Sequence, residues 1–350
     1  MLREIATTTV ATGGRVPSAE RLAAIEAKIR DTVSHGRAAN TLRAYAGDWA
    51  DFVTWCDAVG LQPLPATPGT VAGYLSEMKA PPDDRPPLKV ATMTRRLAAL
   101  GQVHQVCGYP NPCVDQLVKD FMRGARRDLG VAPRQKKAIA TDDIRAAVTA
   151  LDNKAAADRA KGAAGSAPQL LDVRDRLLLL LGFAGAMRRS ELASIDLADV
   201  DQVPEGLLVH LRHSKTDQDR KGRKVEIVYG NDEATCPVRA YRAWVTRLER
   251  QGVTDGPLFR RVDRHGRLLG PLSAEAVAIV VKRHMGRLGY TASDFAGHSL
   301  RRGMATTAAR NGASERTIMR TTGHTSAATV RGYIEDSELF TDPASGYLGL

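Results

Sequence analysis

Helix-type spacing of apolar side chains dominates the first third of this 350-residue chain. In NTLRAYAGDWADFVTWCDAVG, residues 40–60, the apolar positions recur every three or four residues. Asn40 or Thr41 can cap the start of this helix, and Gly60 can end it. The stretches TPGTVAGYLSEMK, VATMTRRLAALGQVHQVCG and CVDQLVKDFMRGARRDLG are also predicted to be helical, and no strand pattern interrupts them. We therefore expect a small all-helical domain over residues 36–129.

The pattern changes at GVAPRQKKAIA, residues 130–140, which combines proline, small residues and a basic cluster. This composition is typical of a linker. Beyond it TDDIRAAVTALD restarts the helical spacing with Thr141 as the N-cap, and residues 153–169 look like a low-information insert. We expect a flexible N-terminal segment over residues 1–35, a second domain over 141–335 and a tail over 336–350.

The second domain contains one strand pattern among helices. In GLLVHLRHSKTDQDRKGRKVEIVYG, residues 206–230, apolar residues alternate on either side of a basic turn, which predicts a hairpin or small sheet. The run LLLLLGFAGAM, residues 177–187, is too short to span a bilayer and is predicted to be a buried helix. Helices are also expected over 236–251, over 273–288 and from His298 onward. The predicted fold class is mainly α with a small antiparallel β-sheet in the second domain (α+β).

The charge balance narrows the choice of partner. Lys and Arg outnumber Asp and Glu by 50 to 39, a net charge of +11. This excess favours a polyanion, nucleic acid first and an anionic membrane surface second. No secretory signal is evident, and Cys56, Cys107, Cys113 and Cys236 have neither zinc-type pairing nor a disulfide framework. We expect reduced thiols in a cytoplasmic protein.

Three short stretches and one turn concentrate side chains suited to phosphate chemistry. GAMRRSEL offers an arginine and a glutamate three residues apart, as on one face of a helix, and GHSLRRG offers a histidine and an arginine at the same spacing. GHTSAATVRGYI holds a histidine and, nine residues later, a tyrosine; HSKTD adds a lysine on the hairpin turn. The candidate catalytic residues are Arg188, Glu191, Lys215, His298, Arg301, His324 and Tyr333.

This inventory suits attack on a phosphodiester without a metal ion or cofactor, because no carboxylate cluster accompanies it. Two arginines can hold the non-bridging oxygens, stabilise the pentacoordinate transition state and favour tyrosinate over the neutral phenol. Tyr333 would attack phosphorus and form a covalent intermediate. A lysine on a flexible turn can protonate the departing sugar hydroxyl.

Each residue alone also has an ordinary explanation. Arg188 and Glu191 could form a helix salt bridge. His298 and His324, each after a glycine, could be helix caps, and Lys215 is one of several lysines near its turn. Bridges and caps give no reason for this inventory in this order, so the set as a whole indicates catalysis.

The ordered set resembles that of the tyrosine recombinases, or phage integrases. R-x-S-E-L, a lysine on a β-turn, H-x-L-R, then G-H-x-S and a tyrosine nine residues after that histidine stand in the order of that family. NTLRAYAGDWADFVTWC, the basic linker and PLFRRVDRHGRL are also similar to Cre-like site-specific recombinases, so the resemblance covers roughly residues 36–335. It implies a helical core-binding (SAM-like) domain and a catalytic domain that together clamp duplex DNA.

The resemblance implies how the phosphate is held. Arg188 and Arg301 would clamp the scissile phosphate, and His324 would donate to a non-bridging oxygen. Glu191 would support the site structurally. Arg188 is chosen over its neighbour Arg189 because the motif leaves one residue between the arginine and the serine.

It also implies the covalent step. Tyr333 would be the nucleophile, joined to the 3′-phosphate, and His298 would assist proton transfer. Lys215 would be the general acid for the 5′-hydroxyl, although Lys221 and Lys224 lie nearby. The implied activity is site-specific DNA recombination through a 3′-phosphotyrosine, with no metal or external energy.

The remaining implications concern DNA contacts and assembly. The tail carries Leu339 and Phe340; in this family such a tail often packs into the neighbouring protomer, closing a homotetramer on two DNA sites, although it could fold back on its own domain. The helix over 273–288 would read the major groove. Each basic residue could instead be a solvated surface charge. The expected DNA contacts, mostly to phosphates, are Arg43, Arg95, Arg96, Arg123, Arg126, Arg127, Arg134, Lys136, Lys137, Lys282 and Arg283.

Other functions stay open. A type IB topoisomerase or a telomere resolvase would share the chemistry, and a DNA-binding regulator could carry a silent site. A metal-dependent nuclease is disfavoured by the missing carboxylate cluster. The sequence predicts neither the target site nor the biological role, and it leaves the need for accessory proteins open.

Overall fold

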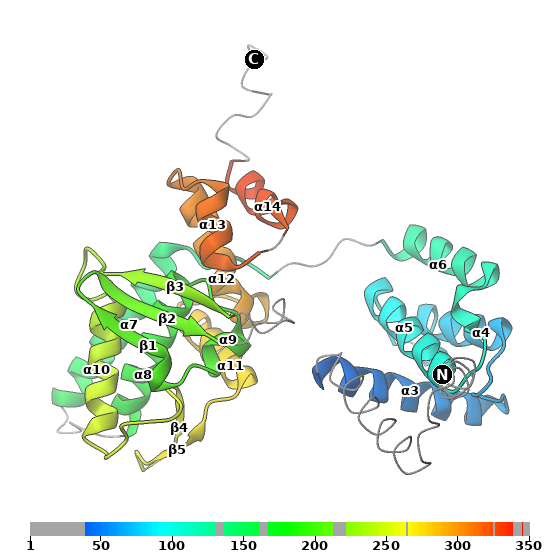
Figure 1. Ribbon diagram of the computed structural model, residues 1–350, viewed down its shortest axis with the longest axis horizontal. Helices are drawn as coiled ribbons and strands as arrows, with labels where there is room; N and C mark the ends of the chain where they lie inside the picture. The colour runs from blue at the N-terminus through cyan, green and yellow to red at the C-terminus, as the bar shows by residue number, and fades with distance from the viewer. Residues whose placement is uncertain are drawn as a thin grey trace, which may run out of the picture. The chain divides into compact units, whose positions relative to one another are not determined.

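The computed structural model describes residues 39–83, 85–130, 136–160, 167–212, 222–263, 265–324, 326–338 and 345. The chain divides into two compact units between Arg134 and Gln135 (Figure 1). Segment 1–35, Arg134, Lys215 and most of the expected tail (339–344 and 346–350) lie outside the described residues. No described helix is long and apolar enough to cross a membrane.

The first unit, as far as the structure describes it, is built from helices alone. They are α3 (Ala39–Val59), α4 (Pro68–Lys79), α5 (Val90–Val106), the 3-10 helix η1 (Pro112–Val114) and α6 (Gln116–Leu129). Thr67 caps α4 by accepting from the Thr70 N–H, and Asp115 caps α6 by accepting from the Leu117 N–H. The prediction of helices and no strands is thus confirmed for this part of the chain.

The apolar stripes of these helices form one core. Phe52, Val71, Leu75 and Met93 are fully buried, so each contributes about 1.5–3 kcal/mol of burial free energy. The buried ring of His104 joins the helices to the loop before α4: its Nε2 accepts from the Ala66 N–H at 2.9 Å, and its Nδ1 donates to the Leu100 carbonyl at 2.8 Å. A polar side chain can stay inside this core because both ring nitrogens are satisfied.

The second unit combines a small sheet with helices (Figure 1). Its strands are β1 (Val200–Val203), β2 (Gly206–Leu211), β3 (Arg223–Val228), β4 (Arg260–Val262) and β5 (Leu268–Pro271). Its helices are α7 (Thr141–Ala160), α8 (Ala167–Ala184), α9 (Arg189–Ala193), η2 (Leu197–Asp199), α10 (Pro237–Glu249), α11 (Ala274–Arg287), η3 (Ala292–Asp294), α12 (Gly297–Arg310), α13 (Glu315–Thr322) and α14 (Ala327–Glu338).

Strands β1, β2 and β3 form an antiparallel sheet in chain order, with Val209 opposite both Val200 and Val225. The predicted hairpin is therefore confirmed as β2 and β3, and the α+β prediction holds. Strand β1 and the separate β4–β5 hairpin go beyond the prediction, since strands of three or four residues are too short to show clear alternation.

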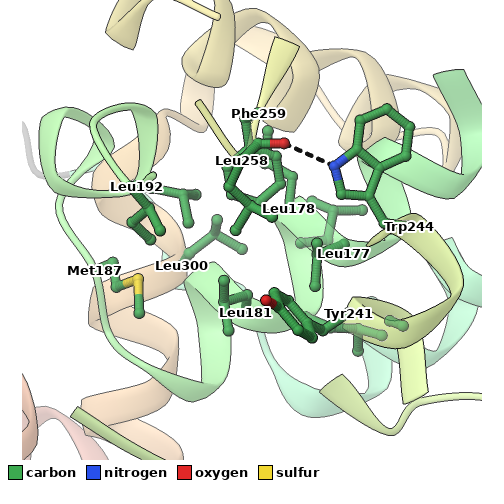
Figure 2. Packing of buried hydrophobic residues seen from close by; sticks show 14 of the residues in the cluster. Leu177, Leu178, Leu181, Met187, Leu192, Tyr241, Trp244, Leu258, Phe259 and Leu300 are labelled. Carbon is green, nitrogen blue, oxygen red and sulfur yellow. Dashed lines mark hydrogen bonds between the residues drawn. The ribbon is translucent and has the colours of Figure 1, made fainter. Parts of the chain in front are cut away.

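The leucine run of α8 forms the centre of the second unit's core. Leu177, Leu178 and Leu181 are fully buried against α10 and α12, among Trp244 and Leu300 (Figure 2). The indole N–H of Trp244 donates to the Leu258 carbonyl at 2.7 Å, so this large ring leaves no buried donor unpaired. All five leucines from Leu177 to Leu181 are buried, because other elements cover every face of this part of α8. The predicted buried helix is confirmed.

The expectation of an insert over residues 153–169 was wrong in part. Residues 153–160 continue helix α7, although residues 153–169 were expected to be an insert, because their alanines favour helix. Residues 136–140, which form the second half of the expected linker, belong to the second unit. The Ile139 N–H donates to the Ser299 carbonyl at 3.2 Å, and a Cβ added at Gly303 would lie 1.9 Å from the Ile139 oxygen.

Candidate active site

Arg188 and Glu191 meet at the start of α9. Arg188 is the N-cap residue with extended backbone, so it precedes the helix rather than sharing a helical face with Glu191 as expected. The Glu191 Oε2 accepts from the Arg188 N–H at 2.9 Å, and Oε1 accepts from the Arg188 Nη1 at 2.5 Å. Glu191 is 1% exposed, so one buried carboxylate both caps the helix and orients a guanidinium.

Arg301 lies on α12 and is fully buried. Its Nη1 donates to the Ala186 carbonyl at 2.9 Å. Ala186 has a φ of 47°, in the left-handed region where a non-glycine residue is strained by about 1–2 kcal/mol. Within the described residues, Nε and Nη2 of Arg301 have no hydrogen-bond partner. Two buried donors of a charged group without acceptors are costly, and an anion would satisfy them.

Tyr333 is positioned by one face of α14. Val330 and Tyr333, three residues apart, pack against Ala305 of α12 and Ile318 of α13. This small core holds the ring, which is 8% exposed, while the hydroxyl lies 3.3 Å from the Nε2 of His298.

His324 completes the cluster. Its ring centroid lies 5.8 Å from that of Tyr333, and its buried Nδ1 has no hydrogen-bond partner among the described atoms. The structure therefore brings together Arg188, Glu191, His298, Arg301, His324 and Tyr333. No group of three or more His, Cys, Asp or Glu that could hold a metal ion occurs in the described ranges.

Burial and the positive charge of the cluster lower the pKa values of three of its side chains. Burial, followed by the charges of Arg301 and Arg188, lowers the pKa of His324 to about 4. The same causes lower the pKa of His298, and burial with neighbouring Arg188 lowers the pKa of Arg301 to about 10. Both imidazoles are therefore neutral at pH 7, and the guanidinium remains charged. The free site resists further positive charge and favours an anion.

Sequence reasoning missed Arg223, the first residue of β3. Its Nη2 donates to the Glu191 Oε2 at 3.1 Å, and its Nη1 donates to the Thr321 carbonyl. One signal was available: Arg223 is in period-two phase with the buried residues Val225 and Ile227, so its side chain had to enter the protein.

Two expected DNA contacts of the first unit are engaged within it. The Nε and Nη2 of Arg95 both donate to the Asp48 carboxylate at 2.9 Å. Arg96 contacts Asp51 and the Tyr74 hydroxyl, and only 17% of its side chain is exposed. Arg95 keeps half of its side chain exposed, so it presents more surface than Arg96.

The other expected contacts of this unit lie at the surface. Arg43, Arg126 and Arg127 are exposed. Arg123 is also exposed and pairs with Asp120 one turn away at 2.7 Å, an interaction worth a few tenths of a kcal/mol. Arg123 can therefore exchange this weak partner for a phosphate at little cost.

The expected contacts of the second unit divide similarly. Lys282 is exposed, whereas Arg283 pairs with the buried Asp175. Lys136 donates to the Ser293 carbonyl, and Lys137 pairs with Asp294 at 2.9 Å. Arg283 is therefore part of a buried ion-pair network, and the two linker lysines hold the segment before α7 against the residues of η3.

Comparison with known proteins agrees with this constellation. The model of the phage integrase family matches residues 139–339. An integrase/recombinase xerD homolog from Selenomonas ruminantium is 36% identical over 334 residues, which cover 94% of this chain and 90% of that protein. The recombinase cre of Escherichia phage P1 is 27% identical over 310 residues, 83% of this chain and 82% of that protein.

Solved structures share the fold. The XerH site-specific recombinase bound to palindromic difH substrate, in a post-cleavage complex, has a TM-score of 0.57. The match covers 80% of this chain and 72% of that one at 17% identity. The family model spans more than half of the chain, and the Selenomonas ruminantium protein is similar over nearly its whole length. This chain therefore belongs to the phage integrase family, the tyrosine recombinases.

Proposed function

We propose that this tyrosine recombinase cleaves and rejoins duplex DNA at specific sites through a covalent phosphotyrosine at Tyr333, without a metal ion or external energy. One observation carries the proposal. The Tyr333 hydroxyl lies 3.3 Å from His298, beside a buried arginine with two unpaired donors. A nucleophile, a proton acceptor and an anion site thus meet around one reacting centre.

The first step is attack of the Tyr333 oxygen on the scissile phosphorus. A neutral His298, favoured by its lowered pKa, takes the phenolic proton. A bond forms between the tyrosine oxygen and phosphorus, and the bond from phosphorus to the 5′-oxygen breaks. Lys215 gives the leaving oxygen its proton. The DNA is then joined to Tyr333 through its 3′-phosphate, and attack by a 5′-hydroxyl reverses the sequence without loss of bond energy.

The two non-bridging oxygens would be held by three side chains. Arg301 offers Nε and Nη2, Arg188 is oriented by Glu191, and His324 adds a neutral N–H. These donors are fixed before DNA arrives, so they stabilise the charge of the transition state with little reorganisation. The Ala186 carbonyl, turned inward by its left-handed backbone, fixes Arg301 from behind.

The proposed partner is double-stranded DNA in the cytoplasm, contacted by both units. The exposed side chains of Arg43, Arg126, Arg127 and Lys282 are the best placed of the expected contacts. Exchange between two duplexes breaks four strands, and each protomer supplies one tyrosine. We therefore propose a homotetramer on two sites, in which tail residues 336–350 contact the neighbouring protomer.

The alternatives make different predictions. A topoisomerase would relax supercoils without joining two sites, and a telomere resolvase would form hairpin ends. A regulator with a silent site would bind DNA equally well after Tyr333→Phe. The Cre-like similarity along most of the chain favours recombination.

The test uses nicked duplex fragments from around the protein's own gene, in buffer with chelator. After denaturation, protein joined to DNA is sought for the native chain and for Tyr333→Phe. We expect an adduct from the native chain alone, on the peptide that contains Tyr333, and recombination between two copies of the recovered site. Binding by both proteins with no adduct from either would contradict the proposed chemistry.

A further inference from the structure

Arg223 has no role in the chemistry above, yet its guanidinium lies among the groups that perform it. It begins β3 and keeps 16% of its side chain exposed. Its two terminal nitrogens point to different elements: Nη2 donates to Glu191 of α9, and Nη1 donates to Thr321 of α13. One planar fork therefore joins segments that are far apart along the chain.

The first branch reaches Arg188 through Glu191. The Glu191 Oε2 accepts from Arg223 at 3.1 Å and from the Arg188 N–H at 2.9 Å, while Oε1 accepts from the Arg188 guanidinium. A buried carboxylate held by one arginine alone could rotate with it. Arg223 fixes the carboxylate from the other side, so the direction of the Arg188 guanidinium is determined as well.

The second branch reaches the turn that carries His324. Thr321 lies in the last turn of α13, where carbonyls lack helical partners and attract cations. Gly323 ends the helix in the left-handed region with a φ of 63°. A Cβ added there would lie 2.8 Å from the Arg223 Nε, so this turn packs directly on the guanidinium.

The backbone of Arg223 lies at the end of the β2–β3 pair, next to the segment that joins these strands. It pairs with Leu211 at the end of the β2–β3 register. The chain between these two residues includes Lys215, the proposed general acid. Arg223 thus stands at the base of that segment while its side chain reaches the phosphate-binding groups.

We infer that Arg223 is a positioning residue for DNA cleavage, which sets Arg188 and His324 at the correct separation to bind the two non-bridging oxygens of one phosphate. The inference rests on the proposed function of the site. Arg223 acts through Glu191 and through the α13 turn, and it touches neither the substrate nor the nucleophile. Loss of this guanidinium shifts two oxyanion donors at once, and small misplacements of such donors cost large factors in rate.

The test compares Arg223→Gln and Arg223→Lys with Glu226→Gln, an exposed neighbour on the same strand. Single-turnover cleavage at saturating DNA is measured on the site recovered with the native protein. We expect Arg223→Gln to lower the cleavage rate about 100-fold, with DNA affinity within about threefold. Arg223→Lys should recover only a small part, because an amine cannot bridge both acceptors as the fork does. Glu226→Gln should cleave normally.

A second substrate separates two kinds of defect. With sulfur in place of the bridging 5′-oxygen, the leaving thiolate needs no proton from Lys215, because thiols are far more acidic than alcohols. The Arg223→Gln defect should persist on this substrate, since the oxyanion donors are misplaced. Full recovery there would overturn the inference and assign Arg223 to the lysine segment alone. Cleavage by folded Arg223→Gln within about threefold of the native rate would overturn it too.

Two further measurements distinguish failure of this inference from poor folding of Arg223→Gln and from failure of the proposed function. Gly323→Ala keeps Arg223 but pushes it from the turn, and should also slow cleavage at unchanged DNA affinity; native-rate cleavage would count against the inference. NMR of the Gly323 and His324 backbone amides needs no DNA: their chemical shifts should change in Arg223→Gln, and not in Glu226→Gln, because the guanidinium that holds the Thr321 carbonyl is removed. If the native protein forms no adduct, the proposed function fails, while unchanged amide shifts of the turn contradict the positioning role independently.

Discussion

Two arginine clusters in this molecule are built on opposite principles. In the first unit, Arg95 and Arg96 face Asp48 and Asp51, so each guanidinium has a carboxylate. In the second unit, Arg188, Arg223 and Arg301 share Glu191. One cluster is neutral by construction, and the other keeps an excess of positive charge.

The difference shows where the chain stores unfavourable energy. A buried charge without a partner costs several kcal/mol, and natural cores avoid it unless function requires it. The neutral cluster fixes α3, α4 and α5 together. The charged cluster destabilises the free protein and would be relieved by a phosphate, which makes it the part of the molecule that is complete only with a ligand.

The strongest test removes the unpaired charge. Arg301→Gln keeps a donor for the Ala186 carbonyl but loses the charge, so cleavage should fall by about 10³-fold. The free energy of unfolding without DNA should rise by about 1 kcal/mol, because a buried cation disappears. Single-turnover cleavage and urea unfolding measure the two effects.

Arg310→Gln, on the exposed end of the same helix, is the matched control and should change neither quantity. A clear loss of stability in Arg301→Gln would show that its charge is balanced after all and would remove the contrast between the clusters.

Removing a carboxylate from the neutral cluster should lower the free energy of unfolding, whereas Arg301→Gln should raise it. Asp48→Ala leaves Arg95 without its bidentate partner, and should destabilise the first unit by about 2 kcal/mol, a reduced value because Arg95 is half exposed. Hydrogen exchange in α3 and α5 measures this. Asp120→Ala, which breaks an exposed pair with Arg123, should cost less than about 0.5 kcal/mol. Equal effects of the two changes would refute the distinction.

A small oxyanion should act on the charged cluster alone. Tungstate at about 100 times its dissociation constant would stabilise the native protein by about 2.7 kcal/mol. The increase in Tm should vanish in Arg301→Gln and survive in Asp48→Ala. A shift that is the same in all three proteins would place the anion elsewhere.

The smallest effect concerns pH. The pKa of His324 is lowered from its ordinary value of about 6.5 to about 4, so between these values the unfolded chain binds a proton that the folded chain does not. Stability is therefore present above about pH 6.5 and is lost as pH falls toward 4. His324→Gln should flatten this part of the curve of unfolding free energy against pH. An unchanged slope would indicate that the ring is solvated.

The sequence was sufficient to predict the helices and strands that carry a long continuous apolar pattern, and the residues of an ordered motif. The α3 stripe, the α8 run and the β2–β3 hairpin follow from spacing alone, because the buried faces are continuous. Short strands such as β4 carry too few residues for a pattern.

Pairings across the fold are harder to predict. Arg96 looks like a surface cation on its own helix, and its partner Asp51 lies 45 residues away on another. Arg223 and Thr321 are separated by 98 residues. Ala186 has a left-handed backbone although it is not a glycine, so its residue type does not predict this conformation. In each case the deciding contact is tertiary, and no local propensity encodes it.

The close approach of Ile139 to Gly303 has a mechanical consequence. With the Ile139 oxygen where a Cβ of residue 303 would be, and the Ile139 N–H bonded to Ser299, the segment before α7 cannot slide along α12. The Arg302 guanidinium donates a hydrogen bond to the Lys136 carbonyl of the same segment at 2.9 Å. A displacement of residues 136–139 is therefore delivered to α12, the helix of His298 and Arg301. Residues 136–139 therefore move together with α12 and its reacting side chains.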